Sequence, residues 1–145
     1  MQTRALTPDH HVSPQIDPAD APALAEAGFT LVICNRPDEE VPPSHQAAAM
    51  EQAVRAAGMD FAVLPVRHDS LTPELIAEQA QLSSAAQAKG GKTLAYCNSG
   101  TRSSFVWALG QAGHRPVEEI MQAGAEVGYD FRPVQHLLGQ QIIPG

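Results

Sequence analysis

The chain has 145 residues, of which 43% are hydrophobic and 17% charged, and its formal net charge is −7. This length predicts a single domain over residues 1–145, and the acidic balance argues against nucleic acid or anionic membranes as partners. The two cysteines make no disulfide framework, no run of about 18 apolar residues occurs, and the start lacks the apolar segment of a signal peptide. We therefore expect a cytoplasmic protein that does not span a membrane.

Extended and helical patterns alternate along the chain. Buried apolar runs predict strands at 29–34, 60–66 and 93–96. Capping residues and apolar periodicity predict helices at 17–28, 44–57 (with Ser44 as N-cap), 72–89, 102–112, 116–125 and 130–138, and residues 3–12 suit an edge hairpin. This alternation predicts an α/β fold with a parallel central sheet flanked by helices, and a ligand site beyond the carboxyl ends of the strands.

Residues 96–103, Tyr-Cys-Asn-Ser-Gly-Thr-Arg-Ser, join the last predicted strand to the helix that follows. The N–H groups of such a loop lack helical partners and form an anion site with the helix dipole. That environment favours the thiolate form of Cys97, while Gly100 permits a tight turn, Arg102 can fork onto a substrate anion, and the Ser103 hydroxyl can reach the sulfur. A buried structural cysteine is the alternative. The expected substrate contacts in the loop are Asn98, Ser99, Gly100, Thr101 and Ser103.

The spacing of this loop, Cys-x4-Arg, is that of rhodaneses, whereas cysteine-dependent phosphatases carry Cys-x5-Arg-[Ser/Thr]. Together with Val-Ser-Pro-Gln at 12–15, Ala-Gly-Phe at 27–29 and Asn-Arg-Pro-Asp-Glu-Glu at 35–40, the loop resembles the phosphatase-like family of beta-lactamase hydrolase-like proteins. The resemblance implies a dual-specificity-phosphatase fold, a link to sulfur transfer, and a persulfide dioxygenase as a partner. It also implies that Cys97 is the nucleophile and Arg102 the anion-binding arginine.

The loop is one residue shorter than in phosphatases, and Tyr96 stands where those enzymes usually place a histidine. One residue is ~3.5 Å of chain, so the shorter loop suits one sulfur atom on Cys97 better than three phosphoryl oxygens. The first prediction is therefore a sulfurtransferase that takes sulfur from thiosulfate or a persulfide, with a small anion as substrate. The second is a phosphatase that acts through a phosphocysteine. The third is a persulfide or peroxide sensor, or an accessory domain, without turnover.

Several residues outside the loop are candidates for the same site. The phosphatase resemblance puts a general acid at Asp69, whose alternative is a turn residue, and His68 is a second candidate. Arg36 is predicted either to contact the substrate anion or to pair with Glu40 and brace the site. Cys34 is either a small buried residue or a resolving thiol. Because the histidines show no metal-ligand spacing, we expect no metal and no cofactor.

Overall fold

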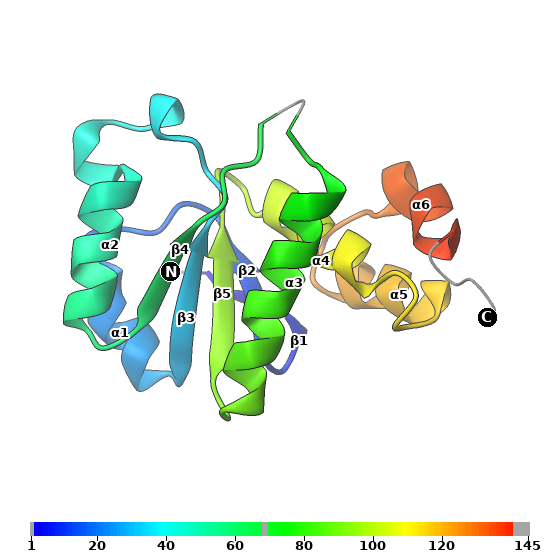
Figure 1. The fold of residues 1–145 in the computed structure, drawn as a ribbon, viewed down its shortest axis with the longest axis horizontal. Helices are drawn as coiled ribbons and strands as arrows, with labels where there is room; N and C mark the ends of the chain where they lie inside the picture. Colours follow the sequence, from blue (N-terminus) through cyan, green and yellow to red (C-terminus); the bar gives the residue numbers. More distant parts are fainter. Residues whose placement is uncertain (1, 68–69, 141–145) are drawn as a thin grey trace.

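A five-stranded sheet runs through the middle of the structure, a computed structural model that describes residues 2–67 and 70–140 (Figure 1). The order across the sheet is β1-β2-β5-β3-β4, and β5 lies at its centre. The strand predicted at 29–34 is confirmed with the same bounds, whereas the one predicted at 60–66 ends at Val63. The strands are β1 (Arg4–Thr7), β2 (His10–Ser13), β3 (Phe29–Cys34), β4 (Asp60–Val63) and β5 (Lys92–Tyr96).

The sheet is mixed, so the prediction of a parallel sheet is wrong at one edge. Strands β2, β5, β3 and β4 pair in parallel, but β1 pairs with β2 in antiparallel orientation. Only Pro8 and Asp9 separate these two strands. A parallel pair needs a crossover of about a dozen residues or more, so a two-residue connection imposes a hairpin. The edge hairpin expected within residues 3–12 is thereby confirmed.

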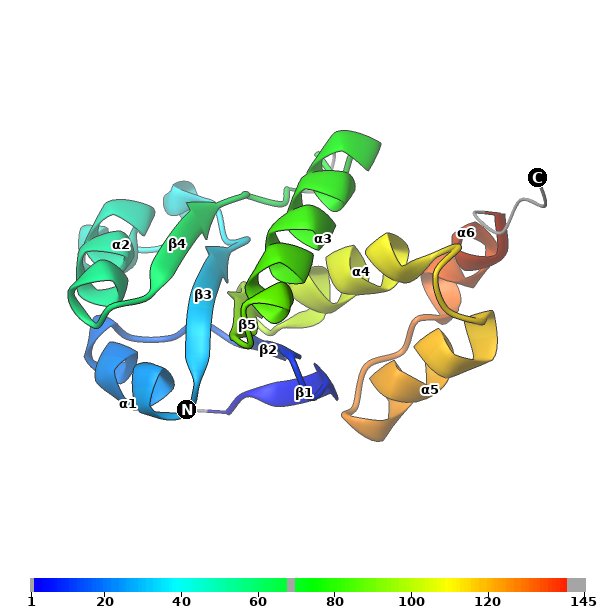
Figure 2. The same ribbon diagram turned by 60° about the horizontal axis from the view of Figure 1, so that its bottom comes forward.

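Helices cover both faces of the sheet, as expected. Alternate residues of β3 divide between two cores, with Leu31 and Ile33 in one and Val32 and Cys34 in the other. Figure 1 shows α1 and α2 on one side and α3 and α4 on the other, and in Figure 2 α5 and α6 lie beyond α4. In the part of the chain that the structure describes, no helix is long and apolar enough to cross a membrane. The helices are α1 (Ala21–Glu26), α2 (Ala47–Ala56), α3 (Pro73–Ala88), α4 (Thr101–Gln111), α5 (Val117–Glu126) and α6 (Gln135–Gln140).

A helix begins where the sequence predicts when its capping residue is a near neighbour in the chain. Helix α3 begins as predicted, because the Thr72 side chain accepts the N–H of Leu75 at 3.2 Å. Helix α2 begins later than predicted, since Ser44 lies in a 3-10 turn over Pro43–His45. Its cap comes from a distant loop instead: the Asp38 carboxylate accepts the N–H of Ala47 at 2.8 Å. This contact ties α2 to the turn that also carries Glu40.

The carboxyl ends of β3, β4 and β5 lie together, at the top of Figure 1. Asn35 joins the three loops that follow these strands. Its N–H donates to the Tyr96 carbonyl at 2.8 Å, and its own carbonyl accepts the N–H of Val66 at 2.8 Å. Its fully buried side chain donates to the Leu64 carbonyl and to Gln79 Oε1, each at 2.8 Å. The loop that contains Cys97 therefore lies beside the loops after β3 and β4, where the topology predicts a ligand site.

Candidate active site

Cys97 follows β5 directly and is completely buried. The N–H of Gly100 donates to the Cys97 sulfur at 3.1 Å. Gly100 has a φ of 93°, in the left-handed region that glycine adopts without strain, and it is the N-cap of α4. The helix begins at the next residue, so its positive end lies close to the sulfur. The backbone thus supplies the kind of environment that the sequence predicts for a thiolate.

The remaining loop residues differ in their burial and in their hydrogen-bond partners. Ser99 Oγ accepts the N–H of Thr101 at 3.3 Å and donates to Thr101 Oγ1 at 2.9 Å. The exposed residue Asn98 accepts the N–H of Gln15 at its carbonyl, at 3.2 Å. Ser103 is completely buried, and its hydroxyl has no hydrogen-bond partner among the described residues. The predicted contact between this hydroxyl and the Cys97 sulfur is therefore not formed.

The Arg102 guanidinium lies between the Cys97 loop and the loops after β3 and β4. It forks onto Glu40, with N–O distances of 2.7 and 2.9 Å, and donates to the Val66 carbonyl at 2.9 Å. Hydrogen bonds to Glu40 raise the pKa of Arg102, burial opposes this, and the charge of Cys97 raises it further. Arg102 is thus a permanent cation beside the sulfur, and its orientation is fixed by a carboxylate.

Glu40 also binds Arg36, so one carboxylate joins two arginines. Arg36 Nε donates to Glu40 Oε1 at 3.3 Å, and another guanidinium nitrogen donates to the Glu40 carbonyl at 3.2 Å. This is the bracing arrangement considered for Arg36. The hydrogen bonds from Arg102 hold the pKa of Glu40 below its usual value. Glu40 is therefore ionised at neutral pH and is not available as a general acid.

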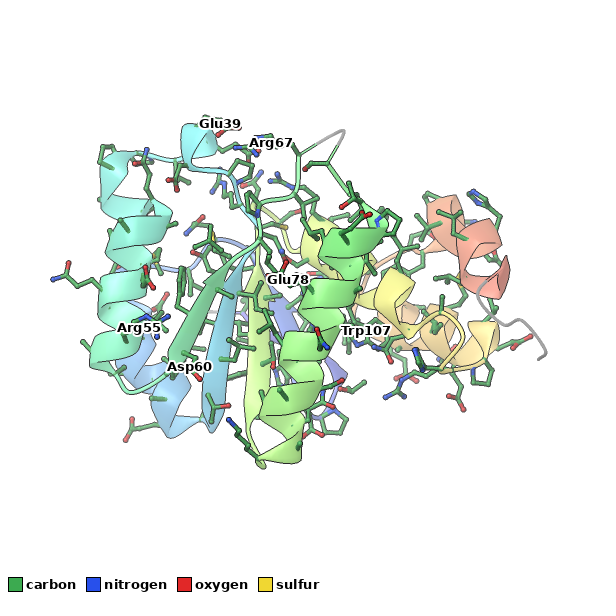
Figure 3. The ribbon with its side chains drawn as sticks, viewed as in Figure 1. Glu39, Arg55, Asp60, Arg67, Glu78 and Trp107 are labelled. Atoms are coloured by element: carbon green, nitrogen blue, oxygen red, sulfur yellow. The ribbon has the colours of Figure 1, made fainter. Side chains whose placement is uncertain are left out.

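A second ion pair joins the same two loops. Arg67 binds both carboxylate oxygens of Glu39, at 2.6 and 2.9 Å, and Figure 3 shows the two side chains directed toward each other. Hydrogen bonds from Arg67 lower the pKa of Glu39 to about 2. Asp69 and His68, the two candidates for a general acid, lie outside the described residues. The segment that precedes them is nevertheless fixed against the loop that carries Glu40.

Replacing Glu40 with glutamine tests whether this carboxylate orients Arg102. An amide cannot accept both guanidinium N–H bonds. We therefore expect kcat/KM of the reaction that Cys97 carries out to fall by about 10-fold, the loss typical of a charge-assisted hydrogen bond. Stability is expected to change little, because exposed ion pairs contribute roughly 0–1 kcal/mol. Glu39→Gln is the matched control, since it removes a neighbouring carboxylate that binds Arg67 instead. Equal losses in both variants, or a gain in Glu40→Gln, would contradict an orienting role.

The second cysteine, Cys34, lies in different surroundings from Cys97. Cys34 is buried at the end of β3, where its Sγ donates to the Arg36 carbonyl at 3.3 Å. Burial raises the pKa of the Cys34 thiol, which favours its interpretation as a small buried residue. Within residues 2–67 and 70–140, no group of three or more histidine, cysteine or acidic side chains is arranged to hold a metal ion.

One neighbour of the loop was not indicated by any sequence pattern. Tyr129, which follows α5, donates its hydroxyl hydrogen to the Ser99 carbonyl at 3.3 Å. Pairing with Glu40 is one of the two interpretations of Arg36 from the sequence, but no sequence pattern indicates the contact of Glu40 with Arg102, 62 positions away. Both contacts depend on tertiary structure, and only the acidic run at 38–40 gave a partial signal.

Solved structures of other proteins share this fold. A protein from Neisseria meningitidis, described as a proposed phosphatase, superposes with a TM-score of 0.75 at 29% identity, over 95% of this chain and 96% of its own. A second proposed phosphatase, from Shewanella putrefaciens, gives a TM-score of 0.71 at 21% identity, over 97% of this chain and 85% of its own, and thus shares the fold.

Sequence comparison identifies the family. A beta-lactamase hydrolase-like protein of Agrobacterium fabrum is 32% identical over 125 residues, which are 85% of this chain and 28% of that protein. The chain therefore spans less than a third of this relative. Residues 2–114 match the family model described as the phosphatase-like domain of beta-lactamase hydrolase-like protein. The chain belongs to this phosphatase-like domain family.

Proposed function

We propose that this domain is a sulfurtransferase in which Cys97 carries the sulfur as a persulfide. The observation that supports it most is the length of the loop, Cys-x4-Arg, which is one residue shorter than the loop of cysteine-dependent phosphatases. The N–H of Gly100 points to the Cys97 sulfur, whereas that of Thr101 is bound by the Ser99 hydroxyl. The shorter loop offers less room than the Cys-x5-Arg loop for the three oxygens of a transferring phosphoryl group. A loop with one N–H directed at the sulfur suits a single added sulfur atom.

The charges around the loop suit a small anionic donor such as thiosulfate. The Cys97 thiolate attacks the outer sulfur, the sulfur–sulfur bond breaks, and sulfite leaves with the electron pair. Arg102 stabilises the charge on the departing sulfite and on the persulfide. A thiolate or cyanide then attacks the outer sulfur of the persulfide, which restores the Cys97 thiolate. Neither step requires a general acid, in keeping with the ionised state of Glu40.

The acceptor and the partner follow from the same chemistry. A low-molecular-weight thiol that receives the sulfur becomes a persulfide. A persulfide dioxygenase, the partner implied by the family resemblance, would consume such a product.

A phosphatase is the second candidate, and the fold favours it. The Neisseria meningitidis relative is described as a proposed phosphatase and matches nearly the whole chain. In this alternative the Cys97 thiolate attacks phosphorus, and the bond from phosphorus to the leaving oxygen breaks. Asp69 would then protonate that oxygen, and water would hydrolyse the phosphocysteine.

One preparation of the protein distinguishes the two reactions. Thiocyanate formation from thiosulfate and cyanide is compared with phosphate release from p-nitrophenyl phosphate. The intermediate is trapped by rapid acid quenching, and the peptide that contains Cys97 is weighed by mass spectrometry. We expect thiocyanate formation and a peptide heavier by one sulfur atom. Phosphate release with a phosphoryl group on Cys97, and no thiocyanate, would establish the phosphatase instead.

A further inference from the structure

The peptide group between Ser99 and Gly100 has partners on two opposite sides. Its carbonyl oxygen accepts the hydroxyl hydrogen of Tyr129 at 3.3 Å, and its N–H donates to the Cys97 sulfur at 3.1 Å. In a planar trans peptide the C=O and N–H bonds point in opposite directions. The direction of the carbonyl therefore fixes the direction of the N–H.

We propose that Tyr129 is a positioning residue that directs the Gly100 N–H at the Cys97 sulfur by holding the Ser99 carbonyl on the far side. Rotation of this peptide by half a turn would place the carbonyl oxygen, with its partial negative charge, against the thiolate. The Tyr129 hydroxyl disfavours that rotation because it would lose its acceptor. Two hydrogen bonds to one peptide group also polarise each other, which strengthens the bond to the sulfur. This inference rests on the proposed role of Cys97 as a thiolate.

Tyr129 is itself firmly placed. It is 7% exposed, and its N–H donates to the Gly124 carbonyl at 2.8 Å. The Arg4 guanidinium lies 5.3 Å from the centre of the Tyr129 ring and donates to the Val127 carbonyl at 3.0 Å. The N-terminal strand thus holds the turn after α5, and through Tyr129 that turn reaches the Cys97 loop.

The phenol keeps its proton and remains a hydrogen-bond donor. Burial raises the pKa of Tyr129, the Arg4 charge opposes this, and the charge of Cys97 raises it further. The hydroxyl also lies directly against the loop backbone, since a Cβ built on Gly100 would overlap Tyr129 Oη and lie 3.3 Å from the Ser13 carbonyl carbon. Among the described residues, Arg102 with its partner Glu40 faces Cys97, and Arg4 faces Tyr129; Tyr129→Phe leaves all three side chains in place.

Tyr129→Phe removes the hydroxyl and keeps the ring that packs against Arg4. The pH midpoint of Cys97 ionisation is measured from the ultraviolet absorbance of the thiolate, with Cys97→Ser protein subtracted. We expect the midpoint to rise by roughly half a pH unit to one unit, as the weakening of one hydrogen bond predicts. We also expect kcat to fall by about 5-fold while KM stays nearly constant. Tyr96→Phe is the matched control, because the Tyr96 hydroxyl lies beside Cys34. In that variant we expect the midpoint of Cys97 ionisation to stay unchanged.

The titration separates this inference from the proposed function. An unchanged midpoint in folded Tyr129→Phe protein would overturn the positioning role, whatever happens to turnover. An equal rise in Tyr96→Phe would also overturn it, because the effect would then not be specific to the loop. A raised midpoint in a protein that forms no thiocyanate would support the role of Tyr129 and contradict the sulfurtransferase.

Discussion

Cys97→Ser is expected to abolish sulfur transfer, with a loss on the order of 10⁴-fold or more. The serine hydroxyl fits the same space and can accept the Gly100 N–H, but it stays protonated at neutral pH and forms no persulfide. Because the shape of the side chain is nearly unchanged, the melting temperature is expected to stay within a few degrees of the wild type. Thiocyanate formation and thermal unfolding, measured on the same samples, check both statements.

Cys34→Ser is the matched control for this result. Cys34 is also a buried cysteine, but it lies at the end of β3 and donates to the Arg36 carbonyl, a bond that a serine hydroxyl can make. We expect turnover within about twofold of the wild type, since surroundings that raise a thiol pKa disfavour the reactive thiolate. Loss of turnover in Cys34→Ser, or retention of turnover in Cys97→Ser, would contradict the assignment of Cys97 as the reactive cysteine.

The parts of the molecule that the sequence predicts well are those with local causes. The strand at 29–34 is one continuous apolar run between turn residues, and Thr72 caps a helix three residues away. The Cys97 loop is similar, because the strand end, the glycine and the helix start are neighbours in the chain. The anion-binding character that we predict for it rests on backbone groups that such a junction leaves without helical partners.

The parts that the sequence does not predict depend on distant contacts. Arg102 meets Glu40 from 62 positions away, and Tyr129 meets Ser99 from 30 positions away. The cap of α2 is another case, because Asp38 replaces the nearer Ser44. Each of these contacts exists only after the sheet and helices have assembled, and a hydrogen-bonding side chain alone does not indicate which partner it will reach.

Gly100→Ala is expected to lower kcat/KM by roughly 100-fold or more, the loss typical when one oxyanion-type donor is misdirected. The new methyl group would overlap the Tyr129 hydroxyl, and the φ of 93° is unfavourable for alanine. Both effects displace the N–H that points to Cys97. Gly58→Ala is the matched control: it introduces the same methyl group at a φ of 89°, with nothing within 4 Å of it. It is expected to cost stability and leave kcat/KM within about twofold.

The double variant Gly100→Ala/Tyr129→Phe separates overlap from backbone strain. In Gly100→Ala the new methyl group overlaps the Tyr129 hydroxyl. When Tyr129→Phe removes that hydroxyl, the nearest side-chain atom is the ring carbon Cζ, 3.2 Å from the Cβ position. We then expect kcat/KM of the double variant to exceed that of Gly100→Ala by several-fold, although Tyr129→Phe alone lowers it. Such a reversal of sign shows direct coupling between the two sites. Losses that simply multiply would mean that strain at Gly100 causes the whole effect and that the hydroxyl acts on the loop independently.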